Sequence, residues 1–172
     1  MASSDSPTPL LSTAYFPPVE YFHLLAGYPA VRVEACESYQ KQSYRNRCLI
    51  YSAGGILPLQ IPVCHDNIKT APVSDILIDY SRDWLHQHRI AIISAYRSAP
   101  FFEYYWDDID AILQSRPQRL FDLNMALTRH IASEMELRCE LVPTDSFAMD
   151  GGPLDFRGRI HPKAKEGPLF AP

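Results

Sequence analysis

The sequence predicts a single α/β or α+β domain, in which a mixed β-sheet of N-terminal strands and a hairpin is covered by three C-terminal helices. Three observations predict this fold class. Apolar and polar residues alternate through much of the first half of the chain, as they do in strands. From Trp84 onward, apolar residues recur at helical spacing instead. With 172 residues, of which 47% are hydrophobic, the chain is long and apolar enough to bury one core.

The first half is expected to supply the strands. Five short segments there are apolar or alternate in polarity, and each is predicted to be a strand: residues 10–15, 31–36, 48–51, 56–63 and 76–79. Gly54 and Gly55 lie between the third and the fourth segment and predict a β-hairpin. We expect the second, third and fourth segments to share one sheet. A short helix is expected from Pro18 to Leu25, because proline suits the first turn of a helix.

The second half is expected to supply the helices. Apolar residues recur every three or four positions in three stretches that are predicted to be helical: residues 84–99, 100–115 and 117–135. Pro100 ends the first of them, and Pro117 suits the first turn of the third. Residues 137–142 are expected to return to the sheet as a further strand.

Three regions are expected along the chain: a flexible arm over residues 1–9, one globular domain over 10–149, and a basic tail rich in Gly and Pro over 150–172. The net charge of −4 argues against a general nucleic-acid binder. No apolar run approaches the ~20 residues that a membrane span needs. The first residues carry no signal-peptide pattern, so a cytoplasmic location is expected. No cofactor and no oligomeric state follow from the sequence.

Metal binding is not expected. The four cysteines form no pairs at ligand spacing, so they are predicted to be reduced thiols rather than zinc ligands. His86 and His88 are two residues apart, which separates them around a helix, whereas a helical metal pair needs a spacing of four. Asp107 and Asp110 share a helix face, which suits either a metal pair or, more commonly, a solvated acidic surface.

A candidate anion site lies in residues 41–48. Arg45 and Arg47 are two residues apart in a segment predicted to be extended, which would send both side chains to one face. Tyr44 and Asn46 add hydrogen-bonding groups beside them. Two guanidinium groups suit a phosphate- or carboxylate-bearing small molecule. The alternative is an exposed strand face whose arginines pair with local acids such as Glu34 or Glu37.

The C-terminal segment repeats basic or titratable residues at every second position. Arg157, Arg159, His161 and Lys163 would share one side if the segment were extended. We expect this segment to fold back over the hairpin and to bring His161 near the arginines of residues 41–48. The alternative is a mobile basic tail without a binding role.

Several motifs in order along the chain resemble one protein family, the WbqC-like family. They lie in residues 15–22 (YFPPVEYF), 41–48 (KQSYRNRC), 59–63 (LQIPV), 94–102 (SAYRSAPFF), 155–157 (DFR) and 161–163 (HPK). Acidic, aromatic and histidine positions between them add to the resemblance, among them Glu34, Glu37, Trp84 and His88. Members usually continue beyond the last motif into an apolar segment that is absent from this sequence. A site completed by that segment would be incomplete here.

The resemblance implies a link to bacterial surface-polysaccharide synthesis, because the family is named for a protein of an O-antigen locus. The implied function is an enzyme that acts on an anionic, nucleotide-activated sugar, with acyl or aminoacyl transfer as the expected reaction. Arg45, Arg47, Arg157 and Lys163 would then bind the anion, while Tyr44 and Asn46 orient the acceptor. His161 is the candidate general base, since histidine titrates near neutrality. The alternative is a non-catalytic binding or scaffold protein for polysaccharide assembly.

Overall fold

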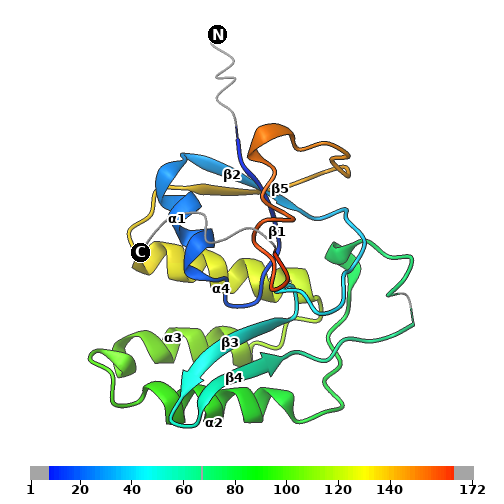
Figure 1. The fold of residues 1–172 in the computed structure, drawn as a ribbon. Helices are drawn as coiled ribbons and strands as arrows, with labels where there is room; N and C mark the ends of the chain where they lie inside the picture. The colour runs from blue at the N-terminus through cyan, green and yellow to red at the C-terminus, as the bar shows by residue number, and fades with distance from the viewer. Residues whose placement is uncertain (1–7, 67, 165–172) are drawn as a thin grey trace.

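Three short strands form a parallel sheet in the computed structural model, which describes residues 8–66 and 68–164. The strands are β1 (Leu10–Ser12), β2 (Ala30–Glu34) and β5 (Glu140–Pro143), in the spatial order β1-β2-β5. Neighbouring parallel strands need a crossover between them, and α1 (Val19–Gly27) supplies the one from β1 to β2 (Figure 1). The predictions of a short helix here and of a returning strand near residue 140 are confirmed.

The predicted hairpin is present but stands apart from this sheet. β3 (Arg47–Ser52) pairs antiparallel with β4 (Gly55–Gln60), and the two strands form a sheet of their own. The prediction that residues 31–36 share a sheet with the hairpin is therefore wrong. Alternating polarity indicates which face of a strand is buried, but it does not say which strands become neighbours. Residues 76–79 form only isolated bridges rather than a strand.

Three helices follow the hairpin, as predicted: α2 (Trp84–Tyr96), α3 (Phe102–Gln114) and α4 (Leu120–Glu134). α4 lies between the parallel sheet on one side and the hairpin, α2 and α3 on the other (Figure 1). Short single turns of 3₁₀ helix, η1 (Val73–Asp75) and η2 (Gly152–Leu154), complete the elements. The fold class is therefore confirmed as one α/β domain, with the correction that its strands form two sheets.

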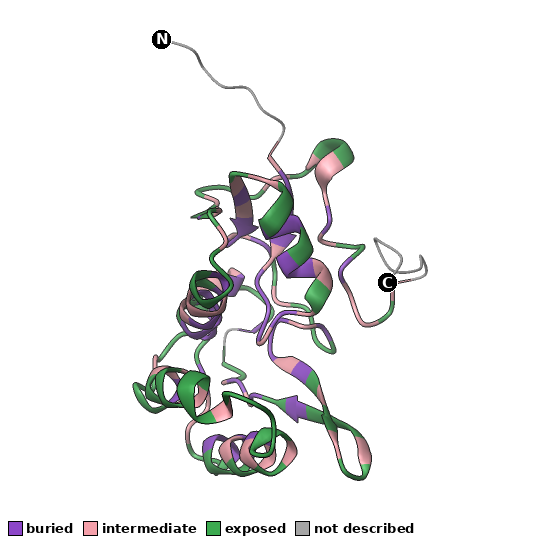
Figure 2. Cartoon of the chain, turned by 90° about the vertical axis from the view of Figure 1, so that its left-hand side faces the viewer, coloured by how far each residue is buried: buried purple, intermediate pink, exposed green. Residues whose placement is uncertain are grey.

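Buried side chains form two apolar clusters that meet at α4. Phe121 and Met125 of this helix pack with the parallel sheet and α1, whereas Leu123 and Leu127 pack with the hairpin and α2. Figure 2 shows buried residues along the strands and the inward faces of the helices, with exposed residues on the outer faces of α2 and α3. Among the described residues, no helix is long and apolar enough to cross a membrane.

The C-terminal segment packs on the parallel sheet. Asp155 forms a parallel bridge with Leu10, and the backbone N–H of Phe156 donates to the Leu10 carbonyl at 2.9 Å. Phe156 and Ile160 are buried in the core cluster around this sheet. The prediction that the segment covers the hairpin is therefore wrong. Residues 1–7 of the expected N-terminal arm and residues 165–172 of the tail lie outside the described residues.

Candidate functional site

One open cleft, with a volume of about 690 Å³, is lined by two regions that are far apart in the sequence, residues 36–45 and residues 147–161. The loop after β2 contributes Glu37 and Gln40, and the turn before β3 contributes Arg45. The C-terminal segment contributes Arg157 and His161. The parallel sheet builds this cleft, because β1 binds the C-terminal segment and β2 leads directly into the loop that forms the opposite wall.

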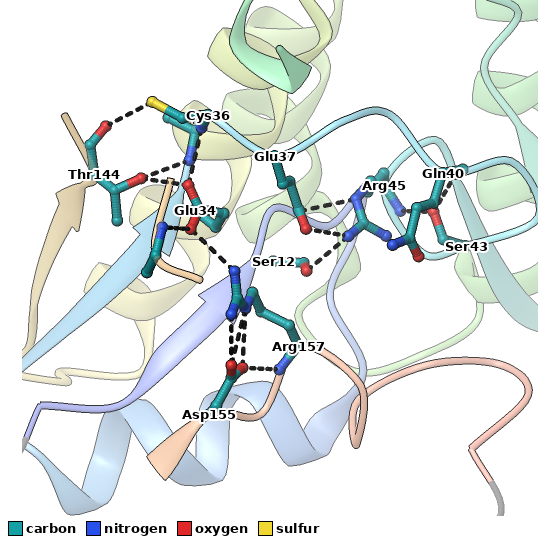
Figure 3. Close-up of polar contacts among 12 residues, drawn as sticks. Ser12, Glu34, Cys36, Glu37, Gln40, Ser43, Arg45, Thr144, Asp155 and Arg157 are labelled. Carbon is teal, nitrogen blue, oxygen red and sulfur yellow. Dashed lines mark hydrogen bonds and ion pairs between the residues drawn. The ribbon is translucent and has the colours of Figure 1, made fainter. Parts of the chain in front are cut away.

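Arg45 is nearly buried, with 2% of its surface exposed, and it lies in a turn before β3 rather than in the strand. Its guanidinium binds the Glu37 carboxylate twice, from Nε to Oε1 at 2.9 Å and from Nη2 to Oε2 at 2.6 Å (Figure 3). Nη2 also donates to the Ser12 hydroxyl at 2.9 Å. Arg47 is the first residue of β3 and is half-buried. The expectation that both arginines extend from one strand face is therefore wrong.

Arg157 is held by two carboxylates (Figure 3). Its Nη2 donates to Asp155 Oδ2 at 2.6 Å, and its Nη1 donates to Glu34 Oε2 at 3.1 Å. The hydrogen bond from Arg157 lowers the pKa of Asp155, and the same interaction raises the pKa of Arg157. The Arg157 guanidinium also lies over the ring of Phe147, 5.4 Å from its centroid. Phe147 lines the cleft and had no signal in the sequence.

Glu34 is fully buried and anchors the wall of the cleft. Besides Arg157, its carboxylate accepts hydrogen bonds from the Thr144 hydroxyl at 2.7 Å and from the backbone N–H of Cys36 at 3.0 Å. A carboxylate buried to this degree is stable only with such partners. In the structure Arg45 pairs with Glu37, as the second of the two sequence interpretations expected. A further ion pair joins Arg157 to Glu34.

His161 lines the cleft, close enough to Arg45 and Arg47 for their charges to act on its ring. Partial burial lowers its pKa, and the nearby charges of Arg45, Lys163 and Arg47 lower it further. The ring nitrogen Nδ1 accepts a hydrogen bond from the backbone N–H of Lys163 at 3.1 Å. A neutral ring in this position therefore carries its proton on Nε2. The Lys163 ammonium donates to Gln42 Oε1 at 2.6 Å, which ties the C-terminal segment to the loop before β3.

The basic residues of the C-terminal segment do not share one side, because the segment turns instead of extending. Residues 157–162 are in turns and bends, and the Ile160 N–H donates to the Phe156 carbonyl at 2.9 Å. Burial of Phe156 and Ile160, four residues apart, favours this turn over a strand. Even so, the turn brings Arg157 and His161 to the cleft that Arg45 lines.

Tyr44 and Asn46 are separated by the structure. Tyr44 lines a small space together with Arg45 and His161, and burial raises the pKa of its hydroxyl. Asn46 is buried, and its amide donates to the Ile61 carbonyl at 2.8 Å, which is a structural contact. It borders a second cleft of about 360 Å³, together with Lys41 and Arg82 among others. The predicted site residues thus fall into a group around Arg45 and a neighbour that faces elsewhere.

A family model described as the WbqC-like protein family matches residues 13–165, which is most of the chain. The matched range includes every residue of the cleft named above. No curated protein and no solved structure matches the chain significantly. The resemblance carried by the sequence motifs is confirmed, and the chain belongs to the WbqC-like protein family.

Proposed function

We propose that the cleft binds a phosphate- or carboxylate-bearing small molecule, and that the protein acts on a nucleotide-activated sugar in surface-polysaccharide synthesis. The convergence of Arg45, Arg157 and His161 from distant segments onto one cleft carries the proposal. A volume of about 690 Å³ falls within the range of small-molecule sites, ~300–1,000 Å³. Membership of a family linked to an O-antigen locus supports the class of pathway, and nucleotide sugars place the proposed activity in the cytoplasm.

The cationic groups of the cleft differ in how many carboxylates they pair with, and this difference indicates which of them bind the anion. Arg45 and Arg157 already face three carboxylates, those of Glu37, Glu34 and Asp155. These arginines therefore shape the cleft and offer an anion only the donors that the carboxylates leave free. Three further cationic or titratable groups have fewer acidic partners: His161, which lines the cleft, and Arg47 and Lys163, whose charges act on His161 from outside the cleft lining. We propose that anion binding depends most strongly on this second set of groups.

Phe147 supplies a flat apolar wall for the uncharged part of the ligand. Its ring is 52% exposed and lies against the Arg157 guanidinium in the same cleft. A nucleobase or the apolar face of a sugar stacks well on such a ring. Tyr44 orients the acceptor from the adjoining space, and Asn46 holds the turn that carries Arg45.

The proposed reaction is acyl or aminoacyl transfer to the sugar, with His161 next to the reacting groups. In this reaction a hydroxyl or amine of the sugar loses a proton to a base as it attacks the acyl carbon, and the leaving group departs with its bonding electrons. His161 acts as that base only after Nδ1 releases the Lys163 N–H. Nδ1 can then take the proton itself, or it can receive the ring proton from Nε2, which leaves Nε2 as the base. In the described arrangement, Nε2–H instead suits donation to a phosphate or to a developing negative charge.

A binding or scaffold protein for polysaccharide assembly is the second candidate. The neutralisation of Arg45 and Arg157 by carboxylates favours it, because a catalytic anion clamp would leave more of their donors free. Both candidates use the same ligand and the same cleft. Only turnover of that ligand therefore distinguishes the enzyme from the scaffold protein.

Calorimetric titration with a nucleoside diphosphate sugar tests binding, and the matching neutral sugar is the ligand control. We expect Lys163→Met and His161→Gln each to weaken binding roughly tenfold, as loss of one charge-assisted hydrogen bond does. The matched controls are Lys69→Met and His86→Gln, whose exposed side chains lie outside the cleft. Equal affinity in all four variants would place the ligand elsewhere.

Incubation of the same sugar with an acyl or aminoacyl donor, followed by mass spectrometry, separates the enzyme from the scaffold. A mass increase on the sugar that His161→Gln reduces supports the transferase. Binding without any product supports the scaffold.

A further inference from the structure

A second cluster of ligand-type side chains lies between α3 and α4. Asp108 of α3 and His130 and Glu134 of α4 each place one potential ligand atom within 4.8 Å of the other two. His130 and Glu134 are four residues apart, so they lie on one face of α4. α3 and α4 pack against each other, which brings Asp108 to the same place. None of these residues lines the cleft described above.

The cluster lacks a counter-charge within the described part of the chain. Neither Asp108 nor Glu134 takes part in any of the salt bridges of the described residues. The Nε2 atom of His130 is shielded from solvent and has no hydrogen-bond partner among these residues. Two like charges close together and an unsatisfied buried nitrogen each cost free energy. Asp110, by contrast, is neutralised by Arg89 and is not one of the three.

We propose that Asp108, His130 and Glu134 form a binding site for a divalent transition metal, with Zn²⁺ as the expected ion. One imidazole and two carboxylates are donors that Zn²⁺ accepts, and three protein ligands leave its fourth position for water. Mg²⁺ and Ca²⁺ prefer oxygen donors alone, so the imidazole selects against them. In a four-coordinate tetrahedral site, ligand atoms ~2.0–2.2 Å from the ion lie about 3.4 Å apart. The ligand atoms of the cluster, which lie within 4.8 Å of one another, must therefore close by up to about 1.4 Å, and the two exposed carboxylates can make this movement.

An apolar cavity beside the cluster supports the proposed metal site. His130 and Glu134 line a cavity of about 200 Å³ together with Tyr105, Ile109, Ile131 and Met135. Apolar walls reduce the water around the charges, and attraction between an ion and its ligands is stronger there than on a fully solvated acidic surface. Bound metal would also link α3 to α4 through Asp108, and it would stabilise the folded chain in proportion to its affinity.

Titration of the tag-free full chain with Zn²⁺ tests the site, and Co²⁺ serves as a spectroscopic substitute. We expect one ion per chain, a rise in melting temperature with Zn²⁺, and visible Co²⁺ absorption typical of a coordination number below six. Replacing a ligand should weaken Zn²⁺ binding roughly tenfold or more in Asp108→Asn, His130→Gln and Glu134→Gln. The matched controls are Asp107→Asn and Glu136→Gln, which remove neighbouring exposed carboxylates outside the cluster.

The carboxylate variants keep the experiment informative. Asp108 and Glu134 are exposed, so Asp108→Asn and Glu134→Gln are expected to fold as the parent chain does, which circular dichroism checks. Preserved Zn²⁺ affinity in these two variants would overturn the proposal. An equal loss in the Asp107→Asn control would also overturn it, because the ion would then respond to acidic charge rather than to this cluster.

Discussion

Each arginine of the cleft is held by a carboxylate that has almost no contact with water. Glu37 is 5% exposed and Glu34 is fully buried, so removal of the partner arginine leaves a charge with little solvation. Such pairs add little net stability over apolar residues, but breaking one is costly. At the scale of single residues, Arg45 and Arg157 thus have a structural role that any binding experiment must separate from ligand contact.

Replacement of Arg45 by methionine should destabilise the protein by about 3–5 kcal/mol, because it leaves Glu37 buried without its partner. Urea unfolding measures this change in free energy. The double variant Arg45→Met/Glu37→Met should recover part of the loss. Arg47→Met, at a half-buried position, is the control and should cost far less. A loss below about 1 kcal/mol in Arg45→Met would mean that the pair is effectively solvated.

The pKa of His161 offers a second test at this scale. Burial and the charges of Arg45, Lys163 and Arg47 lower it, so Lys163→Met should raise the pKa by removing one of these charges. A bound phosphate-bearing ligand should also raise it, since the anion stabilises the protonated ring. Histidine-resolved NMR titration with and without the nucleotide sugar measures both shifts. An unchanged His161 titration in the presence of bound ligand would remove this residue from the anion site.

Among the elements, α4 is the one on which both apolar clusters depend. It presents Phe121 and Met125 to one cluster and Leu123 and Leu127 to the other, so it is buried on two sides. A surface helix has a single apolar stripe, whereas a helix between two layers needs two. The division of the strands into two sheets follows from this position, because α4 separates the parallel sheet from the hairpin layer (Figure 1).

The C-terminal segment is the element that completes the cleft. Phe156→Ala should destabilise the fold by about 3–5 kcal/mol, as loss of a buried aromatic ring does. The same change should weaken ligand binding, because Phe156 anchors the segment that carries Arg157 and His161. Urea unfolding and calorimetry measure the two effects. Met149→Ala, at a side chain that is 90% exposed, is the control. Unchanged stability in Phe156→Ala would show that this segment is not anchored through the core.

For the whole molecule, the buried His88 predicts a dependence of stability on pH. Its ring nitrogen Nδ1 lies 3.0 Å from the Tyr15 hydroxyl in the core, and burial lowers the pKa of His88 to about 4. The unfolded chain therefore binds more protons than the folded one as the pH falls below about 6.5. Above that pH, the contribution of His88 to the free energy of unfolding should be constant. Below it, this contribution should decrease toward pH 4.

The expected loss between pH 6.5 and 4 is about 3 kcal/mol, from a shift of the His88 pKa to about 4. Urea unfolding at pH 7.5, 6 and 5 measures it. His88→Gln should flatten this part of the profile, although His161, whose pKa is also lowered, keeps a smaller slope. An identical pH profile in His88→Gln would show that the imidazole does not resist protonation in the folded state.

Local sequence signals were sufficient for most elements. Proline and the helical spacing of apolar residues predicted α2, α3 and α4 with ends that differ by a few residues from the observed ones. Gly54 and Gly55 predicted the hairpin turn, where Gly55 has a φ of 107° that suits glycine. These signals depend on neighbours in the chain, so the sequence alone carries them.

The candidate site was only partly predictable. The motif residues 41–48 and 155–163 indicated that Arg45, Arg157 and His161 matter, and one cleft does bring them together. The prediction that Arg45 lies in an extended segment and shares a face with Arg47 was wrong, since the conformation and partners of Arg45 depend on the packing of remote segments. The spacing of His130 and Glu134 was visible in the sequence, but Asp108 joins them only through the contact of α3 with α4.

The sequence by itself determined the family, the helices, the hairpin and the residues that carry charge near the cleft. Each of these follows from local propensity, from periodicity or from motifs that can be recognised in the sequence alone. The tertiary structure decided that the strands form two sheets, that Glu34 and Glu37 neutralise the arginines, and that the C-terminal segment turns on β1. Those outcomes depend on which distant segments share a buried surface, and burial sets the cost of every charge placed there.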